Sequence, residues 1–344
     1  MTMHLAIRSP NWVGDLVMAT PVLEAALASP GFERVSIVVR KHLVPVLAGG
    51  PLAAHVHAIE SDAAEVELYR RLDPGAVLLL TNSFGAAWRA FRAGVRVRAG
   101  TALSGRRFLL THAAVPPTRD GRRLPIPSAH LHRDAAGLLG IVVPNLHPRL
   151  YFEGDVARAS SEMLTRVGIG AGDYVLCCPG AAFGAAKLWP VERFAEVLDR
   201  LHARFGWRGV VSGGPGEEAL IDGVARACTH GAVSLASEPR DLASLKPLVG
   251  RARLLVVGDS GPRWYAAAFD VPCVSVMGPN FPEVTATSLE LAQIVRQEGL
   301  ECAPCLQKAC PLGHHRCMVE LPPVRVYAAA LEVLERAATR VVAS

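Results

Sequence analysis

The feature that most constrains this chain is a repeated alternation of short apolar runs with segments of helical periodicity. Apolar runs at 4–9, 34–40 and 76–81 have the length and composition of strands, and helices are expected over 16–28 and 85–93. Short apolar strands separated by helices are typical of a parallel sheet that is covered by helices on both faces. The sequence therefore predicts an α/β fold.

The alternation pauses in the middle of the chain and then starts again. The stretch 116–127 is rich in Pro and Arg and predicts an exposed loop, and 142–155 ("VVPNLHPRLYFEGD") predicts a connection between domains. Further strands are expected at 174–180, 209–213, 253–261 and 272–279, with helices between them. We expect two α/β domains, residues 1–155 and 156–344, each with its own parallel sheet, and a helix at the C-terminus.

Composition excludes some classes of protein. Half of the residues are apolar (51%), which argues against disorder, and the longest apolar runs, such as 76–80, are too short to cross a bilayer. The first ten residues lack the apolar core of a secretory signal. A cytoplasmic protein is the expectation.

The net charge of +5 is unevenly distributed along the chain. Nine arginines lie between Arg89 and Arg123, against one acid, Asp120. This segment is either a solvated surface or a face that meets an anionic partner, such as a small molecule or a phosphorylated lipid surface. Nucleic acid is not expected, because the chain has no aromatic–basic recognition motif and no zinc-finger spacing of the DNA-binding kind.

Three strand-to-helix loops of the second half carry candidate binding residues. The first, "CCPGAAFGAAKLWP" at 177–190, contains Gly180 and Gly184, which leave backbone N–H groups accessible, and Lys187, a point charge suited to a phosphate. The alternative is an ordinary loop with a solvated lysine. The clustering of Gly, Lys and Trp favours an anion site.

The second loop, "SGGPGEEA" at 212–219, resembles a dinucleotide fingerprint only weakly. Glu217 or Glu218 could accept hydrogen bonds from a ribose, or could equally complement the dipole of the next helix.

The third loop lies within "VVGDSGPRWYAAA" at 256–268. Its bare backbone amides precede a helix that begins with a proline, an arrangement suited to a diphosphate. The candidate residues are Gly258, Asp259, Ser260, Gly261 and Pro262. Capping of the helix is a competing role for Asp259 and Ser260.

One carboxylate of the first half, Asp15, stands where a turn becomes a helix in "NWVGDLVMATP". A carboxylate in this position is either a helix cap or a group that does acid–base chemistry. The residues alone leave both roles open.

A cysteine cluster follows the last expected strand. Cys302, Cys305, Cys310 and Cys317 give the spacing C-x2-C-x4-C-x6-C. Four thiols in 16 residues are able to hold a structural zinc ion or an iron–sulfur cluster, and the alternative is a loop of reduced thiols. The cluster is expected to lie away from the nucleotide-binding loops.

Together these segments resemble the ADP-heptose:lipopolysaccharide heptosyltransferases of glycosyltransferase family 9, and most closely the heptosyltransferase II branch. The resemblance rests on "NWVGDLVMATP", "CPGAAFGAAKLWP", "GDSGP…AAAFDVPCVSVMGP" and "CAPCLQKACPLGHHRCM". It implies the GT-B architecture, in which two Rossmann-like parallel-sheet domains face each other across a cleft and the C-terminal one binds the donor. It also implies metal-independent, inverting transfer of L-glycero-D-manno-heptose from ADP-heptose to the heptose/Kdo inner core of lipopolysaccharide.

The resemblance assigns roles to the candidate residues. Asp15 is implied to be the general base, while Lys187 and the amides of 258–261 would meet the donor diphosphate. No cofactor is required for this catalysis. The implied acceptor, a phosphorylated lipid A-core, lies on the cytoplasmic leaflet of the inner membrane, and an arginine-rich face would suit peripheral contact with it. Trp264 stands where most members have a histidine, which puts the identity of the sugar in doubt.

Three other functions remain open at this point. One is a GT-B transferase that uses another nucleotide sugar or acceptor. Another is a nicotinamide-dependent oxidoreductase, although the first expected strand is followed by "SPNWVGD" rather than by a glycine fingerprint. A non-enzymatic binding protein stabilised by metal at its cysteines is the last.

Overall fold

The computed structural model describes residues 3–170 and 174–343. The chain divides into two compact units: Met1–Tyr151 with Glu283–Thr287, and Phe152–Pro282 with Ser288–Ser344. We call them the N-terminal and C-terminal units. The boundary that we expected between residues 155 and 156 falls inside the first helix of the C-terminal unit, α6 (Gly154–Arg166).

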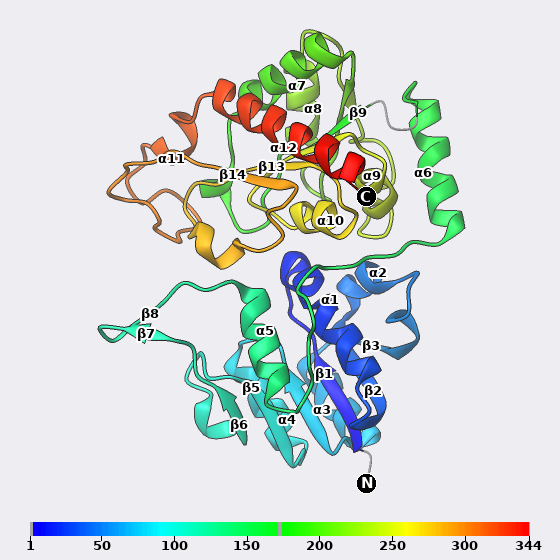
Figure 1. Ribbon diagram of the computed structural model, residues 1–344, viewed down its shortest axis with the longest axis vertical. Coiled ribbons are helices and arrows are strands. Elements are labelled where there is room, and N and C mark those ends of the chain that lie inside the picture. The colour runs from blue at the N-terminus through cyan, green and yellow to red at the C-terminus, as the bar shows by residue number, and fades with distance from the viewer. Residues whose placement is uncertain (1–2, 171–173, 344) are drawn as a thin grey trace. The chain divides into compact units, whose positions relative to one another are not determined.

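The sheet of the N-terminal unit has six parallel strands in the order β3-β2-β1-β4-β5-β6 (Figure 1). The strands are β1 (Met3–Arg8), β2 (Phe32–Arg40), β3 (Val56–Ile59), β4 (Ala76–Leu79), β5 (Val97–Thr101) and β6 (His112–Ala114). The central strands are buried on both faces, as their near-continuous apolar sequence requires.

Five α-helices of this unit connect or cover the strands: α1 (Val13–Ala28), α2 (Val44–Leu47), α3 (Asp62–Leu72), α4 (Phe84–Arg92) and α5 (Ser128–Gly137). The stretch 116–127, expected to be a plain loop, contains a short hairpin of β7 (Thr118–Arg119) and β8 (Arg122–Arg123). Asp120 and Gly121 form its turn with φ values of 51° and 72°. An Asp-Gly pair favours this two-residue turn because both residues tolerate positive φ.

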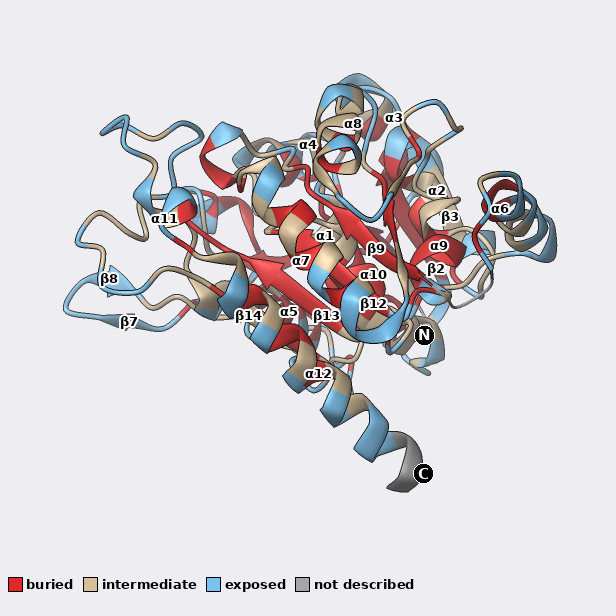
Figure 2. Cartoon of the chain, turned by 90° about the horizontal axis from the view of Figure 1, so that it is seen from above, coloured by how far each residue is buried: buried red, intermediate tan, exposed pale blue. Residues whose placement is uncertain are grey.

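The C-terminal unit has the same topology, with strand order β11-β10-β9-β12-β13-β14. Its parallel strands are β9 (Tyr174–Cys178), β10 (Arg208–Val211), β11 (Val233–Ser234), β12 (Leu254–Gly258), β13 (Cys273–Val276) and β14 (Ala292–Val295). Figure 2 shows β9, β12 and β13 as buried strands, in agreement with their uninterrupted burial.

The described helices that accompany this sheet are α6, α7 (Val191–Phe205), α8 (Glu218–Ala227), α9 (Leu245–Gly250), α10 (Pro262–Ala268), α11 (Arg316–Val319) and α12 (Pro323–Ala343). α12 packs its apolar face on α7, β13 and β14 and places Val326, Ala330 and Val333 in the core. Within the described residues, no helix combines the length and apolar character needed to span a bilayer.

Both sheets follow the doubly wound strand order 3-2-1-4-5-6, so each has a switch point beside its first strand. Ligands of such sheets bind beyond the carboxyl ends of the strands at this point. The switch points lie between β1 and β4 in one unit and between β9 and β12 in the other. The expected α/β fold with two Rossmann-like parallel sheets is confirmed.

Candidate functional site

The three candidate donor loops of the C-terminal unit follow adjacent strands. β9 lies between β10 and β12 in the sheet, so the loops after these strands emerge side by side at its carboxyl edge. The loop after β9 leads to a short 3-10 helix, Ala185–Lys187, and then to α7. Lys187 and the loop after β12 therefore meet at the switch point.

Lys187 is held there by Asp259. Its Nζ lies 2.7 Å from Oδ2 of Asp259 and 3.3 Å from the backbone oxygen of the same residue. The ammonium also lies 4.8 Å from the centre of the Phe183 ring. Asn280 Nδ2 donates to the same Asp259 oxygen at 2.5 Å. Lys187 is only 7% exposed, so it is not the solvated surface lysine of the alternative interpretation.

Glu217 reaches across to the loop after β9. Its Oε2 accepts a hydrogen bond from the backbone N–H of Gly214 at 2.7 Å. A Cβ at Gly180 would collide with the Glu217 carboxylate, so only glycine allows this close approach. The sequence interpretation gave Gly180 an accessible amide, and the structure adds that it makes room for a carboxylate.

Glu218, although adjacent in sequence, has a different environment. It forms an ion pair with Arg240 at 2.6 Å and accepts from the backbone N–H of Gly216 at 3.2 Å. Backbone N–H donors at the start of α8 and the Arg240 guanidinium lower the pKa of this carboxyl group. The structure thus separates the two glutamates: Glu217 contacts the Gly180 loop, and Glu218 is engaged by Arg240.

The loop after β12 runs from Gly258 through Ser260 and Gly261 to Pro262, where α10 begins. A Cβ at Gly258 would lie 3.5 Å from the backbone oxygen of Gly180, so the loops after β9 and β12 are close neighbours. α10 has only seven residues, so its helix dipole is short. An anion bound at this segment would interact mainly with the backbone N–H groups of the loop.

The two residues after Pro262 face inward. Arg263 and Trp264 are both buried, and the Arg263 guanidinium lies 4.6 Å from the centre of the Trp264 ring. Burial lowers the pKa of Arg263. Trp264 is therefore part of the packed interior of this structure.

Asp15 belongs to the N-terminal unit, in the segment that follows β1. It is the third residue of α1 and is partly buried. The N-cap of α1 is Trp12, which makes no side-chain capping bond. Asp15 is thus not the N-cap residue, although an acid in the first turn still interacts favourably with the helix dipole.

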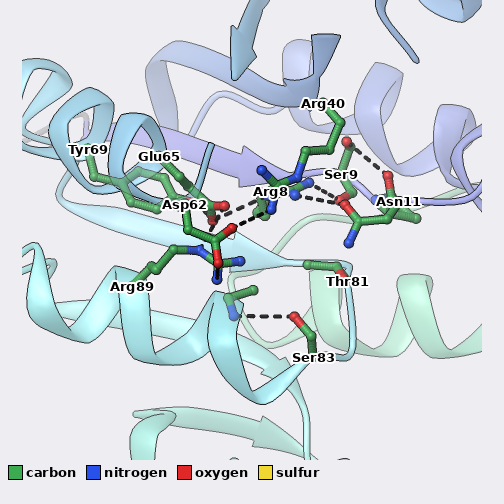
Figure 3. Close-up of polar contacts among 12 residues, drawn as sticks. Arg8, Ser9, Asn11, Arg40, Asp62, Glu65, Tyr69, Thr81, Ser83 and Arg89 are labelled. Carbon is green, nitrogen blue, oxygen red and sulfur yellow. Dashed lines mark hydrogen bonds and ion pairs between the residues drawn. The ribbon is translucent and has the colours of Figure 1, made fainter. Parts of the chain in front are cut away.

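A buried ion pair fixes the segment between β1 and α1. Figure 3 shows Arg8, the last residue of β1, between Glu65 on one side and Ser9 and Asn11 on the other. Arg8 Nε lies 3.2 Å from Glu65 Oε1, and both side chains are fully buried. Arg8 also donates to the backbone oxygen of Ser9 at 2.6 Å and to Asn11 Oδ1 at 2.7 Å.

The ion pair extends outward to a second arginine. Arg89 Nε lies 2.9 Å from Glu65 Oε2, and its Nη1 lies 2.9 Å from Asp62, which also pairs with Arg40 (Figure 3). Sequence reasoning missed this network. The available signal was an arginine at the end of an otherwise apolar strand, since a buried arginine requires a partner.

Several arginines of 89–123 have structural roles. Arg106 is fully buried and donates to the backbone oxygens of Thr101, Thr81 and Leu79. Burial lowers its pKa to about 10. Arg98 donates to the backbone oxygens of Leu109 and Val95, at 2.7 and 2.5 Å. With Arg89, these residues stabilise the fold rather than forming a free basic face.

The cysteine-rich segment lies directly against the loop that carries Lys187, and the expectation that it would lie apart was wrong. The backbone N–H of Ala186 donates to the backbone oxygen of Lys308 at 3.0 Å. His315 Nε2 lies 2.8 Å from the backbone oxygen of Ala186. The contact was not predictable, because it joins positions more than 120 residues apart.

Cys317 is affected by the other three thiols of this segment. Burial and the neighbouring thiols of Cys305, Cys310 and Cys302 raise the pKa of Cys317 to about 11. Cys310 Sγ accepts from the backbone N–H of His315 at 3.4 Å. No three His, Cys, Asp or Glu side chains within 3–170 and 174–343 are arranged to hold a metal ion.

The chain is similar in sequence to known heptosyltransferases. The chain is 29% identical over 160 residues to lipooligosaccharide heptosyltransferase 2 of Campylobacter jejuni (serotype O:2), a match that covers 46% of this chain and about half (50%) of the relative. It is 26% identical over 348 residues to lipopolysaccharide heptosyltransferase 2 of Escherichia coli K12, covering 94% and 96% of the two chains.

A solved structure confirms the fold. The structure of E. coli ADP-heptose lps heptosyltransferase II superposes with a TM-score of 0.73 at 21% identity, covering 97% of this chain and 99% of that one. The model of the family described as glycosyltransferase family 9 (heptosyltransferase) matches residues 67–316, well over half of the sequence. The chain therefore belongs to glycosyltransferase family 9, as the motifs of its loops indicated.

Proposed function

We propose that this protein transfers L-glycero-D-manno-heptose from ADP-heptose to the heptose/Kdo inner core of lipopolysaccharide, with inversion at the anomeric carbon. The observation that carries the proposal is the Lys187–Asp259 pair at the switch point of the C-terminal sheet. The names of the relatives, lipooligosaccharide heptosyltransferase 2 and lipopolysaccharide heptosyltransferase 2, support a heptose as the sugar and this class of glycolipid as the acceptor.

The C-terminal unit is proposed to bind the donor. The Lys187 ammonium would meet the diphosphate. Asp259 holds the lysine in place, and Asn280 donates to the same Asp259 oxygen. The amides of Gly258, Ser260 and Gly261 would add neutral donors to the same phosphates. These groups offset the negative charge that grows on ADP as the bond to the sugar breaks.

The two glutamates of the second loop are not equally suited to bind the ribose. Glu217 lies beside Gly180 in the binding region, whereas Glu218 is engaged by Arg240. Glu217 is therefore the proposed acceptor of ribose hydroxyl hydrogen bonds.

Asp15 is proposed as the general base. Its carboxylate would take the proton of the acceptor hydroxyl while that oxygen bonds to the anomeric carbon and ADP leaves from the opposite face. Direct displacement inverts the centre without a covalent enzyme intermediate. The buried Arg8–Glu65 pair fixes the backbone of Ser9 and the side chain of Asn11, and so the path of the chain toward Asp15.

The four clustered cysteines are proposed, on the spacing of their thiols, to hold one structural zinc ion or an iron–sulfur cluster, which requires their side chains to turn toward one another from the arrangement described above. Thiolates are the preferred ligands of both, and the backbone N–H donated to Cys310 Sγ is the kind of contact that supports a ligating sulfur. The contacts from Lys308 and His315 to Ala186 would let this metal brace the Lys187 loop.

Elemental analysis of the purified protein tests the metal proposal. About one zinc per chain, or iron and sulfide in stoichiometric amount, is the expected result. Protein that is folded, binds ADP and contains neither metal would refute it.

The phosphorylated lipid A-core acceptor implies action at the cytoplasmic leaflet, with peripheral contact between the protein and the inner membrane. Arg89, Arg98 and Arg106 have structural roles and are not counted here. We propose that the other exposed arginines attract the anionic membrane surface, among them Arg92, Arg96 and Arg107.

Nucleotide competition tests the donor half of the proposal. ADP is expected to displace ADP-heptose from the protein, and UDP at the same concentration is not. Displacement by UDP as effective as that by ADP would favour the second candidate, a transferase of this family that uses another nucleotide sugar. The buried Trp264, in place of the usual histidine, is the observation that keeps this candidate open.

A further inference from the structure

The N-terminal unit exposes four large aromatic residues close together in the fold. They are Phe84, Trp88, Phe91 and Phe108, with exposed fractions of 44, 44, 48 and 75%. We call them the aromatic surface. Single exposed apolar residues are ordinary, but a contiguous aromatic group on a soluble chain marks a surface that meets an apolar partner.

Helical geometry places three of these rings on one face. Phe84, Trp88 and Phe91 occupy positions i, i+4 and i+7 of α4, so they project from the same side. The side that packs on the core is made of Ala86, Ala87 and Ala90, which are fully buried. The small alanines fix α4 closely on the unit, and its large apolar side chains point away from it.

Ring contacts join the four residues in two pairs. The Phe84 and Phe108 rings lie 6.0 Å apart, and the Trp88 and Phe91 rings lie 5.7 Å apart. Arg98, held by backbone oxygens, places its guanidinium 5.3 Å from the centre of the Phe91 ring. The backbone that carries these rings is therefore held in place by packing and hydrogen bonds.

The backbone around Phe108 is also held in place by hydrogen bonds. Phe108 lies in the 3-10 helix Arg107–Leu109, directly after Arg106. Arg106 anchors this turn to the ends of β4 and β5 through the backbone oxygens of Leu79 and Thr101.

The segments that carry the aromatic surface contain charge of one sign, and the acids that reach α4 from α3, Asp62 and Glu65, pair with Arg89. Arg92, Arg96 and Arg107 are exposed in the same segments, and the sequence contains no Asp or Glu from 84 to 119. Aromatic side chains flanked by arginines match the boundary of a bilayer, where rings enter the interfacial region and cations meet anionic headgroups.

We propose that the aromatic surface docks the N-terminal unit on a bilayer that contains anionic phospholipid. A second copy of this chain fits less well, because a symmetric contact through this face would bring the arginines of both copies together. The inference rests on the peripheral membrane contact of the proposed function and assigns a surface to it. Its test can fail independently of the transfer reaction, because lipid binding is measured without donor or acceptor.

The test is co-sedimentation of the full-length protein with vesicles of phosphatidylethanolamine and phosphatidylglycerol, compared with vesicles of phosphatidylcholine alone. The double variant Trp88→Ser/Phe108→Ser removes two rings from the aromatic surface. Phe205→Ser, at an exposed phenylalanine on α7 in the other unit, is the matched control. Circular dichroism and ADP binding establish that each variant is folded.

The wild type and the control are expected to bind the anionic vesicles with equal affinity, and the double variant at least about tenfold more weakly. Equal binding of the wild type and the double variant would overturn the proposal. So would a wild type that does not bind vesicles but forms a dimer that the double variant loses, since the surface would then serve a second copy.

A second measurement uses a conservative variant, which keeps an aromatic ring at position 88. Vesicles with brominated acyl chains are expected to quench tryptophan emission in the wild type and clearly less in the conservative variant Trp88→Phe. Equal quenching in both proteins would show that Trp88 does not enter the bilayer and would contradict the proposed surface.

Discussion

The first strands of the two sheets, β1 and β9, both end near a buried cation, but the two cations are held differently. Arg8 is the last residue of β1 itself, is fully enclosed, and directs its donors to Glu65, Ser9 and Asn11. Lys187 comes from the loop that follows β9 and contacts a carboxylate, a backbone oxygen and the face of a ring.

This difference shows how one topology serves two purposes. Arg8 uses its guanidinium on groups of its own unit and makes the segment before Asp15 rigid. Lys187 has a compact ammonium at the switch point, where it contacts Asp259 of the neighbouring loop. The same strand order thus supports a structural cation in one unit and a proposed ligand-binding cation in the other.

Replacement of Asp15 by Asn is expected to have the largest effect, because it removes the proposed base and preserves the volume of the side chain. We expect kcat to fall by roughly 10²- to 10⁴-fold, with ADP affinity unchanged, since the proposed donor site is in the other unit. Steady-state kinetics with calorimetry of ADP binding provides both quantities. Loss of ADP binding along with activity would show that Asp15 is structural.

Glu65→Gln tests the structural cation. The substitution leaves the Arg8 guanidinium buried without its counter-ion and is expected to lower the free energy of unfolding by about 3–5 kcal/mol. Asp62→Asn is the matched control in the same network; because Asp62 is 63% exposed, we expect a loss below about 1 kcal/mol. Urea denaturation measures both. Equal losses would mean that burial does not distinguish the two carboxylates.

Lys187→Ala tests the proposed ligand-binding cation. It removes a charge from the diphosphate and leaves Asp259 as an uncompensated negative group nearby. The donor KM is expected to rise about 10- to 100-fold, the range for one charged hydrogen bond. Lys308→Ala, at an exposed lysine whose contact with Ala186 uses only its backbone, is the control. An unchanged KM in Lys187→Ala would remove the lysine from the site.

His132, on α5, gives the N-terminal unit a specific dependence on pH. Burial lowers the pKa of His132 to about 4. A hydrogen bond with the backbone of Leu80 raises this pKa, but by less than burial lowers it. The unfolded chain, with a pKa near 6.5, takes up the proton first as the pH falls. Stability contributed by neutral His132 is therefore complete above pH 6.5 and is lost progressively between pH 6.5 and 4.

The difference in unfolding free energy between the wild type and His132→Gln should shrink by about 2 kcal/mol between pH 7 and pH 5. The exposed His112→Gln is the control and should show no such change. A difference that stays constant with pH would mean that His132 is not kept neutral by the fold.

The sequence predicted the strands that are long and apolar, and missed those that are short or carry polar residues. β1, β2, β4, β9, β10, β12 and β13 all coincide with expected apolar runs. β3, β5, β6, β11 and β14 lie toward the edges, and segments such as "VRAGT" and "HAA" have no continuous apolar pattern. Pairing with a neighbouring strand, rather than local composition, determines their conformation.

The candidate site was predictable at the level of loops. Loops that follow adjacent parallel strands must meet, so the convergence of the segments of Gly180, Glu217 and Gly258 follows from topology. The Lys187–Asp259 pair and the separation of Glu217 from Glu218 do not follow, because they depend on side-chain direction. The contact of the cysteine segment with Ala186 joins distant parts of the sequence and has no local signal.

Acceptor-dependent release of ADP tests the central claim most directly. Purified protein would be given ADP-heptose and a lipid A acceptor carrying Kdo and one heptose, with parallel reactions that omit the acceptor or replace the donor with a UDP-sugar. The account predicts ADP release and a heavier glycolipid product only when both substrates are present. Transfer from the UDP-sugar, or no transfer by a protein that still binds ADP, would contradict it.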